Sequence, residues 1–168
     1  NDYAQITFLS TTDGQNCLKK GDEFWRIMTF IPNSTTYDTT TDTDIAFEAG
    51  RIIGRFHDLL KKVDVEIIED TLPKFHNLAY RTQEFKEALK NTAPEKKEIA
   101  HKAIEQAHHF LKELEQLNNE NLPIRVCHND TKLNNILFSK ATQKALCLID
   151  LDTIMKGYFF YDFGDAIR

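Results

Sequence analysis

The stretch His128–Asn135, which reads HNDTKLNN, decides the fold of this chain. It has the form H-x-D-x-x-x-x-N and lies between two short apolar runs, Ile124–Cys127 and Ile136–Phe138, whose composition is typical of strands. A polar turn and a third apolar run, Ala145–Ile149, follow it. We therefore expect a loop mounted on strand ends, followed by a β-hairpin that brings polar side chains from both ends of this region into one cleft.

The spacing of polar residues along this region matches the needs of phosphoryl transfer. That reaction requires a group that orients the attacking hydroxyl, and oxygen ligands that hold Mg²⁺ beside the phosphates. Asp130 is the predicted catalytic group, and Asn135, five positions later, is a predicted metal ligand. Asp150, directly after the third apolar run, is the second predicted metal ligand. Asp152 is either a further metal contact or a turn carboxylate.

Two other features of this region have a structural and a functional interpretation. His128 is predicted to brace the loop through hydrogen bonds, and Lys132 is either functional or a solvated surface lysine. The sequence Asp162–Gly164 spells D-F-G, a kinase metal motif, but it lies 27 residues after Asn135 and not at a hairpin end. We therefore interpret Asp162 as structural or as a residue that lines the substrate.

Composition limits the classes of partner and compartment. The chain has 168 residues, 41% of them hydrophobic, and a net charge of −5, which argues against a general nucleic-acid binder. Its three cysteines are widely spaced and form no C-x-x-C, so neither a zinc site nor a disulfide framework is expected. No run has the length of a membrane span, and no signal peptide is visible. We expect a cytoplasmic protein without membrane or nucleic-acid partners.

Periodicity predicts the remaining elements. Phe24–Ile31 is dense in aromatic and β-branched residues and is expected to be a buried strand, with Trp25 in the core. Gly50 and Gly54 lie one turn apart and suggest close helix packing. Apolar residues at helical spacing predict three helices: Ile45–Leu60, Phe75–Leu89 and Ala100–Leu117. Asp42 or Thr43 is expected to cap the first of them.

The loop His128–Asn135 together with Ile149–Asp152 resembles the aminoglycoside phosphotransferase and choline kinase superfamily. Protein kinases have H-R-D in this loop. Here Asn129 replaces the arginine that meets a phosphorylated activation loop, which favours a small-molecule kinase. The resemblance implies an α+β, protein-kinase-like fold. Residues 1–32 would form the end of an antiparallel small lobe, and residues 33–168 a mainly helical large lobe with the catalytic hairpin.

A closer resemblance is to the N-acetylhexosamine 1-kinase branch of that superfamily. The segments that carry it are Phe24–Ile31, Tyr37-Asp38, Leu72–His76, Asp150–Gly157 and Asp162–Arg168. It implies ATP and Mg²⁺ as cofactors and the anomeric hydroxyl of an N-acetylhexosamine as the small-molecule acceptor. It also implies residue roles: Thr29, Phe30 and Ile31 at the adenine-binding hinge, Lys132 near the transferring phosphate, and Asp38, Asp162, Asp165 and Arg168 as candidate substrate contacts.

The chain departs from the family pattern at its start and its end. It has no Gly-rich phosphate loop and no small-lobe lysine strand, and it stops where further helices are expected. We therefore expect a kinase fragment that lacks the N-terminal part of its small lobe and is inactive alone. Two alternatives remain open: a kinase for aminoglycosides, choline or another small alcohol, and a non-catalytic binding module.

Overall fold

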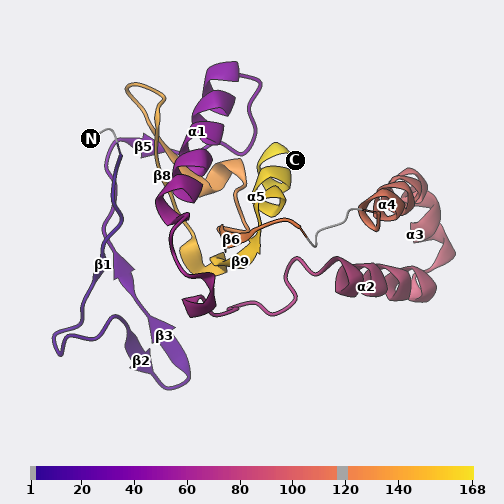
Figure 1. Ribbon diagram of the computed structural model, residues 1–168, viewed down its shortest axis with the longest axis horizontal. Coiled ribbons are helices and arrows are strands. Elements are labelled where there is room, and N and C mark those ends of the chain that lie inside the picture. The colour runs from indigo at the N-terminus through magenta and orange to yellow at the C-terminus, as the bar shows by residue number, and fades with distance from the viewer. Residues whose placement is uncertain (1–2, 117–120) are drawn as a thin grey trace. The chain divides into compact units, whose positions relative to one another are not determined.

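The computed structural model describes residues 3–116 and 121–168 (Figure 1). The chain divides into two compact units. Unit 1 consists of Asn1–Thr71 and Ile124–Arg168, and unit 2 of Leu72–Pro123. The expected boundary at residue 32, between a small and a large lobe, concerns a different division of the chain and stays a prediction.

The predicted catalytic hairpin is present in unit 1. Strand β7 (Ile136–Ser139) pairs antiparallel with β8 (Ala145–Leu148), which confirms both strand predictions. The short strand β5 (Ser34–Thr35) pairs with the other edge of β7, antiparallel as well. The hairpin therefore lies inside a three-stranded sheet, and this sheet is the platform on which the following polar residues are held.

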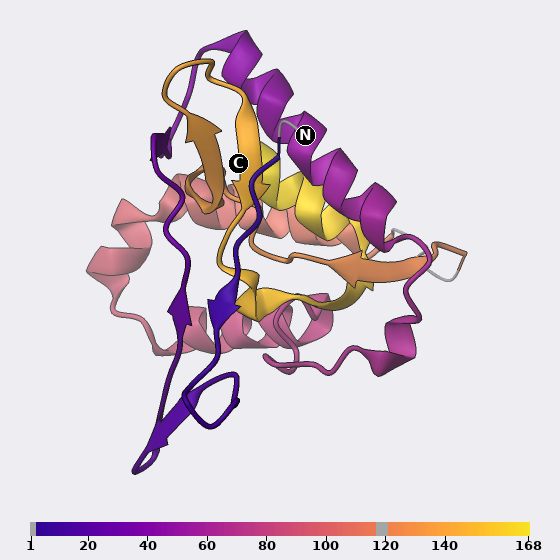
Figure 2. The same ribbon diagram turned by 90° about the vertical axis from the view of Figure 1, so that its left-hand side faces the viewer.

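Helix α1 (Thr43–Leu60) covers this sheet. It begins where the sequence predicts, because the side chain of Asp42 accepts a hydrogen bond from the Asp44 N–H at 2.8 Å. Figure 2 shows α1 running alongside β8, with helix α5 (Phe159–Ile167) next to it. The buried apolar side chains of α1 and of the two hairpin strands form the main core, namely Ile45, Ala49, Ile52, Ile53, Ile136, Phe138, Ala145 and Leu148.

A second strand pair leads into and out of the loop region. Strand β6 (Ile124–Cys127) pairs antiparallel with β9 (Met155–Tyr158), and α5 follows β9 without a gap. Three short 3₁₀ turns lie in unit 1. Val65–Ile67 follows α1, Leu133–Asn135 lies between β6 and β7, and Leu151–Thr153 lies between β8 and β9. The register pairs Cys127 with Met155, so the catalytic loop begins beside the start of β9, whereas α5 begins next to the start of β6.

The cysteines of these strands are structural. Cys127 is fully buried, and burial raises the pKa of its thiol to about 12. Burial also raises the pKa of the Cys147 thiol to about 11. Since a thiol reacts as its thiolate, neither group is a nucleophile at neutral pH.

The N-terminal strands differ from expectation. They form two separate antiparallel pairs, β1 (Phe8–Leu9) with β4 (Ile27–Met28) and β2 (Leu18–Lys20) with β3 (Glu23–Trp25). The prediction of one buried strand with a core tryptophan is wrong, because Trp25 is 59% exposed and the segment is broken at Arg26. Two-stranded ribbons bury a face only when a second layer covers them, and no described residue supplies that layer.

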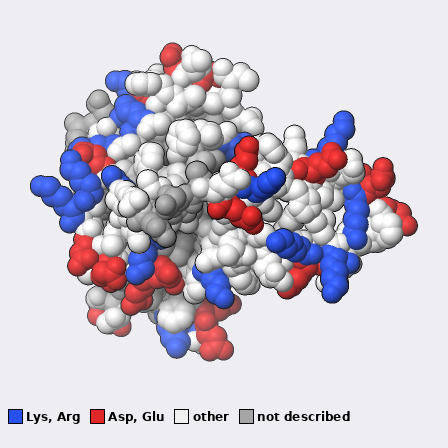
Figure 3. Space-filling view, turned by 45° about the vertical axis from the view of Figure 1, so that its right-hand side comes forward, with Lys and Arg blue, Asp and Glu red and all other residues white. Residues whose placement is uncertain are grey.

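Unit 2 is a set of helices: α2 (Leu78–Asn91), α3 (Pro94–Ile99) and α4 (His101–Leu114). The first begins later than expected, because Asn77 caps it by accepting from the Tyr80 N–H. The last ends at Leu114, and the predicted end at Leu117 lies outside the described residues. Figure 3 shows Lys and Arg side chains interspersed with Asp and Glu over this unit, the arrangement of a solvated surface.

The glycines of α1 and β9 have opposite surroundings. The prediction of close helix packing at Gly50 and Gly54 is wrong, because a Cβ on either would meet no described atom within 4 Å. At Gly157, in contrast, a Cβ would lie 2.9 Å from Cδ2 of Tyr161 and 3.4 Å from Oδ1 of Asn129. Gly157 therefore allows a close approach of β9 to α5 and the catalytic loop.

This difference predicts opposite effects of alanine at two glycines. Gly157→Ala is expected to lower the free energy of unfolding by about 1–3 kcal/mol, since the added methyl group overpacks the contact with Tyr161. Gly54→Ala, the matched control, is expected to raise it by up to about 1 kcal/mol, because alanine favours the helix. Urea denaturation followed by circular dichroism measures both. Equal changes in the two variants would contradict the close approach at Gly157.

Candidate active site

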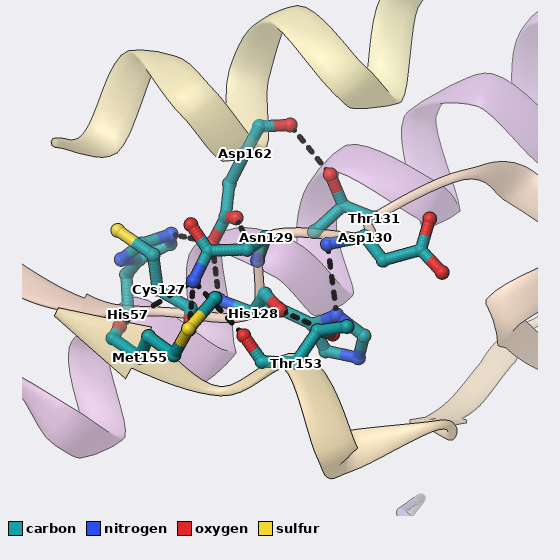
Figure 4. Close-up of polar contacts among 9 residues, drawn as sticks. All are labelled: His57, Cys127, His128, Asn129, Asp130, Thr131, Thr153, Met155 and Asp162. Carbon is teal, nitrogen blue, oxygen red and sulfur yellow. Dashed lines mark hydrogen bonds and ion pairs between the residues drawn. The ribbon is translucent and has the colours of Figure 1, made fainter. Parts of the chain in front are cut away.

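The loop between β6 and β7 brings three predicted residues into contact. Oδ2 of Asp130 accepts hydrogen bonds from Nζ of Lys132 and from Nδ2 of Asn135, both at 2.8 Å. The same Asn135 nitrogen donates to the backbone oxygen of Asp130 at 2.9 Å. Because both side-chain donors bind Oδ2, Oδ1 is the oxygen that remains for an incoming group. Figure 4 shows the Asp130 carboxylate pointing away from the side chains that cluster around Asp162.

Asp162, in the first turn of α5, binds the backbone of this loop through hydrogen bonds. Its Oδ2 accepts from the backbone N–H of His128 at 2.9 Å, and its Oδ1 from that of Asn129 at 2.6 Å. Its backbone oxygen accepts from the Thr131 hydroxyl at 2.6 Å (Figure 4). The side chain is fully buried, which leaves it no surface for a substrate. These contacts favour the structural interpretation of Asp162, in which it positions the loop.

One residue of this network was not predicted from the sequence. His57, from α1, places its Nε2 2.8 Å from Oδ2 of Asp162, and the imidazole is buried. The two residues are 105 positions apart, so no local pattern links them. The available signal was a polar side chain four residues after Ile53, on the apolar face of the helix.

His128 braces the loop from inside, in the way that the sequence suggested. Its Nδ1 accepts from the Asp130 N–H at 3.3 Å, and its Nε2 lies 2.9 Å from the Ile149 carbonyl oxygen. Since Nδ1 is an acceptor, the ring proton is on Nε2 and is donated to Ile149. This contact joins the catalytic loop to the end of β8. The Thr153 hydroxyl adds a hydrogen bond to the His128 carbonyl oxygen at 2.7 Å.

The predicted metal ligands lie at the open end of the hairpin. The Ile149 N–H donates to the Asn135 carbonyl oxygen at 2.9 Å, which joins the two positions through their backbones. Asp150 follows in the left-handed region (φ 61°, ψ 56°), with its side chain exposed. Asp152 is placed differently, because its carboxylate forms an ion pair with Arg26 and is 60% exposed.

The oxygen ligands present suit Mg²⁺. The described residues contain no group of three or more His, Cys, Asp and Glu that would hold a metal ion by themselves. Mg²⁺ is usually held by one or two carboxylates together with phosphates and water. Asp150 offers a carboxylate, and the Asn135 amide has its nitrogen side occupied by Asp130, so its oxygen side is the part that a cation would take.

Lys132 is surrounded by negative charge. Its hydrogen bond with Asp130 raises the pKa of the ammonium group, and the charges of Asp130, Asp150 and Asp165 act in the same direction. A raised lysine pKa means that the cation is fully present at neutral pH and is lost only as the pH rises above the ordinary lysine range. Lys132 is thus a permanent positive charge beside Asp130 under physiological conditions.

The other candidate substrate residues differ in availability. Oδ1 of Asp165 accepts from Nε of Arg168 at 2.6 Å, whereas its Oδ2 is buried and accepts from no described residue. Oδ1 of Asp38 accepts from Nδ2 of Asn134 at 3.2 Å, which attaches that aspartate to the catalytic loop. Arg168 is largely exposed. Asp165 is therefore paired at one oxygen and buried at the other, whereas Arg168 is the more accessible of the two residues.

The expected adenine-binding segment follows β4. The Thr29 N–H donates to the Thr7 carbonyl oxygen at 2.9 Å, and the Ile31 carbonyl oxygen accepts from the Ser34 hydroxyl at 2.7 Å. The Thr29 N–H therefore has a partner already, whereas the Ile31 carbonyl oxygen keeps a second lone pair. Phe30 lies between them and is 85% exposed.

Comparison with known proteins places this loop in a family. Residues 6–168 match the phosphotransferase enzyme family, APH. The chain belongs to this family. The resemblance noted at the level of the aminoglycoside phosphotransferase superfamily is thereby confirmed.

A solved structure supports the fold of this chain. The structure of an aminoglycoside-3'-phosphotransferase of type VIII is similar to it, with 20% sequence identity and a TM-score of 0.54. The likeness covers 90% of this chain and 56% of that one, so this chain spans little more than half the length of that relative. The expected α+β, protein-kinase-like fold is confirmed. In the described part of the chain, no helix has the length and apolar character needed to cross a membrane.

Proposed function

We propose that this phosphotransferase moves the γ-phosphoryl group of ATP to a hydroxyl of a small molecule, with Asp130 as the catalytic carboxylate. The observation that carries the proposal is the geometry of Asp130. Two donors, Lys132 and Asn135, bind one of its oxygens at 2.8 Å and so orient the other toward an incoming hydroxyl. A base must lie within hydrogen-bond reach of the proton that it takes, and this arrangement holds it still.

The proposed reaction assigns a role to each residue of the site. The acceptor hydroxyl gives its proton to Oδ1 of Asp130 as its oxygen bonds to the γ-phosphorus, and the bond to the ADP oxygen breaks. Lys132 stays protonated and balances negative charge on the transferring group. Asn135 and Asp150 would hold Mg²⁺, which neutralises phosphate charge when bound, and Asp152 would serve as a further contact once released from Arg26.

The nucleotide site is proposed to need more of the small lobe than this chain contains. We place adenine at the segment Thr29–Ile31, mainly against Phe30, whose neighbours already use a backbone group each. The exposed apolar side chains of β1 to β4 support a further layer of small-lobe strands over them in the intact protein. On this proposal the chain alone binds ATP weakly and is inactive. We propose the cytoplasm as its compartment, since all three cysteines are free thiols.

We propose an N-acetylhexosamine, phosphorylated at its anomeric hydroxyl, as the acceptor. Sugar hydroxyls need hydrogen-bond partners, and Asp165 lies on α5, one turn after Asp162, which holds the catalytic loop. Asp38 and Arg168 are the other proposed contacts. A second candidate is a cationic acceptor such as an aminoglycoside or choline, because three carboxylates, Asp130, Asp150 and Asp165, all lie close enough to Lys132 to raise its pKa.

The test measures ADP release by the intact encoded protein with Mg-ATP and a panel of acceptors. The panel holds N-acetylglucosamine, N-acetylgalactosamine, glucosamine, kanamycin and choline. Turnover on an N-acetylhexosamine supports both the chemistry and the acceptor. Turnover confined to kanamycin or choline keeps the kinase and rejects the hexosamine. If no acceptor of the panel leads to ADP release and the protein does not bind ATP, a non-catalytic binding module is favoured.

A further inference from the structure

We propose that His57 is a positioning residue for phosphoryl transfer, which holds the catalytic loop in its active shape by orienting the carboxylate of Asp162. His57 belongs to α1 and touches none of the reacting groups. It acts on Asp130 through two intermediates, the Asp162 side chain and the loop backbone. The proposal rests on the proposed catalytic role of Asp130 and adds a residue that lies outside the loop.

The chain of contacts is short and buried throughout. Nε2 of His57 lies 2.8 Å from Oδ2 of Asp162, and that same oxygen accepts from the His128 N–H at 2.9 Å. The other oxygen of Asp162 accepts from the Asn129 N–H at 2.6 Å. The His57 and Asp162 side chains are 6% and 0% exposed, so water does not replace a lost partner easily. Asp130 is the next residue in the loop after Asn129.

The chemistry of the pair requires a donor at this position of α1. Asp162 faces two backbone N–H groups, and a carboxylate that accepts from them is stabilised by a further donor on its free lone pair. The Nε2–H of His57 supplies that donor. Oδ2 then has donors from two directions, from α1 and from the loop, which sets the rotation of the carboxylate about its own axis. Without His57 only the loop itself would orient Asp162.

Apart from Nε2, the His57 ring packs against aromatic side chains and makes no hydrogen bond among the described residues. Its ring makes edge contacts with Phe56 and Phe159, with centroids 5.5 Å and 4.8 Å away. Its Nδ1 is buried and contacts no hydrogen-bond partner among the described residues. An apolar ring would satisfy this packing equally well, so the structure separates two roles of His57: the ring fills space, and the single Nε2–H orients Asp162.

The shape of the loop matters for Asp130 because the preceding residue, Asn129, has a left-handed backbone. Its φ is 66°, in a region that asparagine adopts more readily than most residues, and contacts with its surroundings restrain it there. The hydrogen bond from its N–H to Asp162 is one of those restraints. Loosening Asp162 would therefore let the backbone relax at Asn129 and turn Asp130 away from Lys132 and Asn135.

Two substitutions of opposite character separate the donor from the packing. His57→Phe keeps a ring between Phe56 and Phe159 and removes the N–H, whereas His57→Gln loses the ring and keeps an N–H donor near the position of Nε2. Both are made in the intact encoded protein. The first readout is amide hydrogen exchange at His128 and Asn129, which needs no substrate. The second is kcat and KM for whichever acceptor the protein phosphorylates.

The expected result is a clear division between the variants. In His57→Phe, exchange at His128 and Asn129 accelerates at least 10-fold and kcat falls at least 10-fold, with both KM values within 3-fold of wild type. In His57→Gln, both readouts stay within 3-fold of wild type. Better retention of both readouts in His57→Phe than in His57→Gln would overturn the proposal, since packing would then be the role of His57.

The two readouts also keep this inference apart from the proposed function. If exchange accelerates in His57→Phe but the wild-type protein phosphorylates no acceptor, the proposed kinase function fails while the positioning contact stands. If the wild type is active and His57→Phe retains normal kcat and normal exchange, the inference fails and the kinase function stands.

Discussion

Replacing Asp130 with asparagine is expected to lower kcat by about 10²- to 10⁴-fold, the usual contribution of a general base. The KM values for ATP and for the acceptor should change little, because the substituted group acts on the proton that moves in the transition state. Steady-state ADP release by the intact encoded protein measures both parameters. This is the largest effect on activity that we expect from a single substitution.

The reason lies in how the two oxygens of Asp130 are used. An asparagine at this position can keep its amide oxygen where Oδ2 accepts from Lys132 and Asn135, both at 2.8 Å in the wild type. Its amide nitrogen then occupies the place of Oδ1, and that group donates protons and does not accept them. The loop is therefore expected to keep its shape while the chemistry is lost.

The matched control for Asp130→Asn is the same change at Asp58. That carboxylate lies on the exposed side of α1, where it pairs with Arg55 and Lys61. These pairs are screened by solvent and lie outside the catalytic loop, so Asp58→Asn should leave kcat within about 2-fold of wild type. If Asp130→Asn retained more than a tenth of the wild-type kcat, Asp130 would not be the base.

Replacing Asp162 with alanine is expected to lower the free energy of unfolding by about 3–5 kcal/mol, as for other disrupted buried ionic contacts. The substitution removes the acceptor of two backbone N–H groups, those of His128 and Asn129, and of the His57 imidazole. Each buried donor left without a partner costs about 1–3 kcal/mol. Because small domains are stable by only about 5–15 kcal/mol, this variant is expected to be marginally folded.

The control for Asp162→Ala is Asp42→Ala, at the cap of α1. There a single side-chain hydrogen bond to the Asp44 N–H is lost at an exposed position, with an expected cost of about 1 kcal/mol. Urea denaturation followed by circular dichroism compares the two. A cost at Asp162 no larger than the cost at Asp42 would show that the loop holds its shape without this carboxylate.

The predictions made from local patterns agree with the structure where neighbouring residues decide the outcome. The hairpin, the start of α1 at its cap and the meeting of Asp130 with Asn135 all depend on residues within a few positions of one another. In each case the hydrogen bonds and the apolar periodicity are encoded in one continuous segment. The family assignment, in contrast, rests on a match over residues 6–168.

The errors concern burial and long-range contacts. The segment Phe24–Ile31 has the composition of a buried strand, yet its side chains are exposed because no described layer covers it. Gly50 and Gly54 have the spacing of a helix contact, yet nothing lies against them. The composition of a segment shows that its side chains could be buried against another element. Whether such an element lies against the segment is decided by the rest of the fold.

By itself, the sequence determined the phosphotransferase family, the catalytic loop and the hairpin that holds Asp130 and Asn135 together. Only the tertiary structure decided that Asp162 accepts hydrogen bonds from the loop backbone, and that His57, 105 residues away in the sequence, contacts the same carboxylate. The physical reason is the range of the interactions. Strand, turn and cap energies arise between close neighbours in the chain, whereas a buried carboxylate finds its donors only after distant segments have packed together.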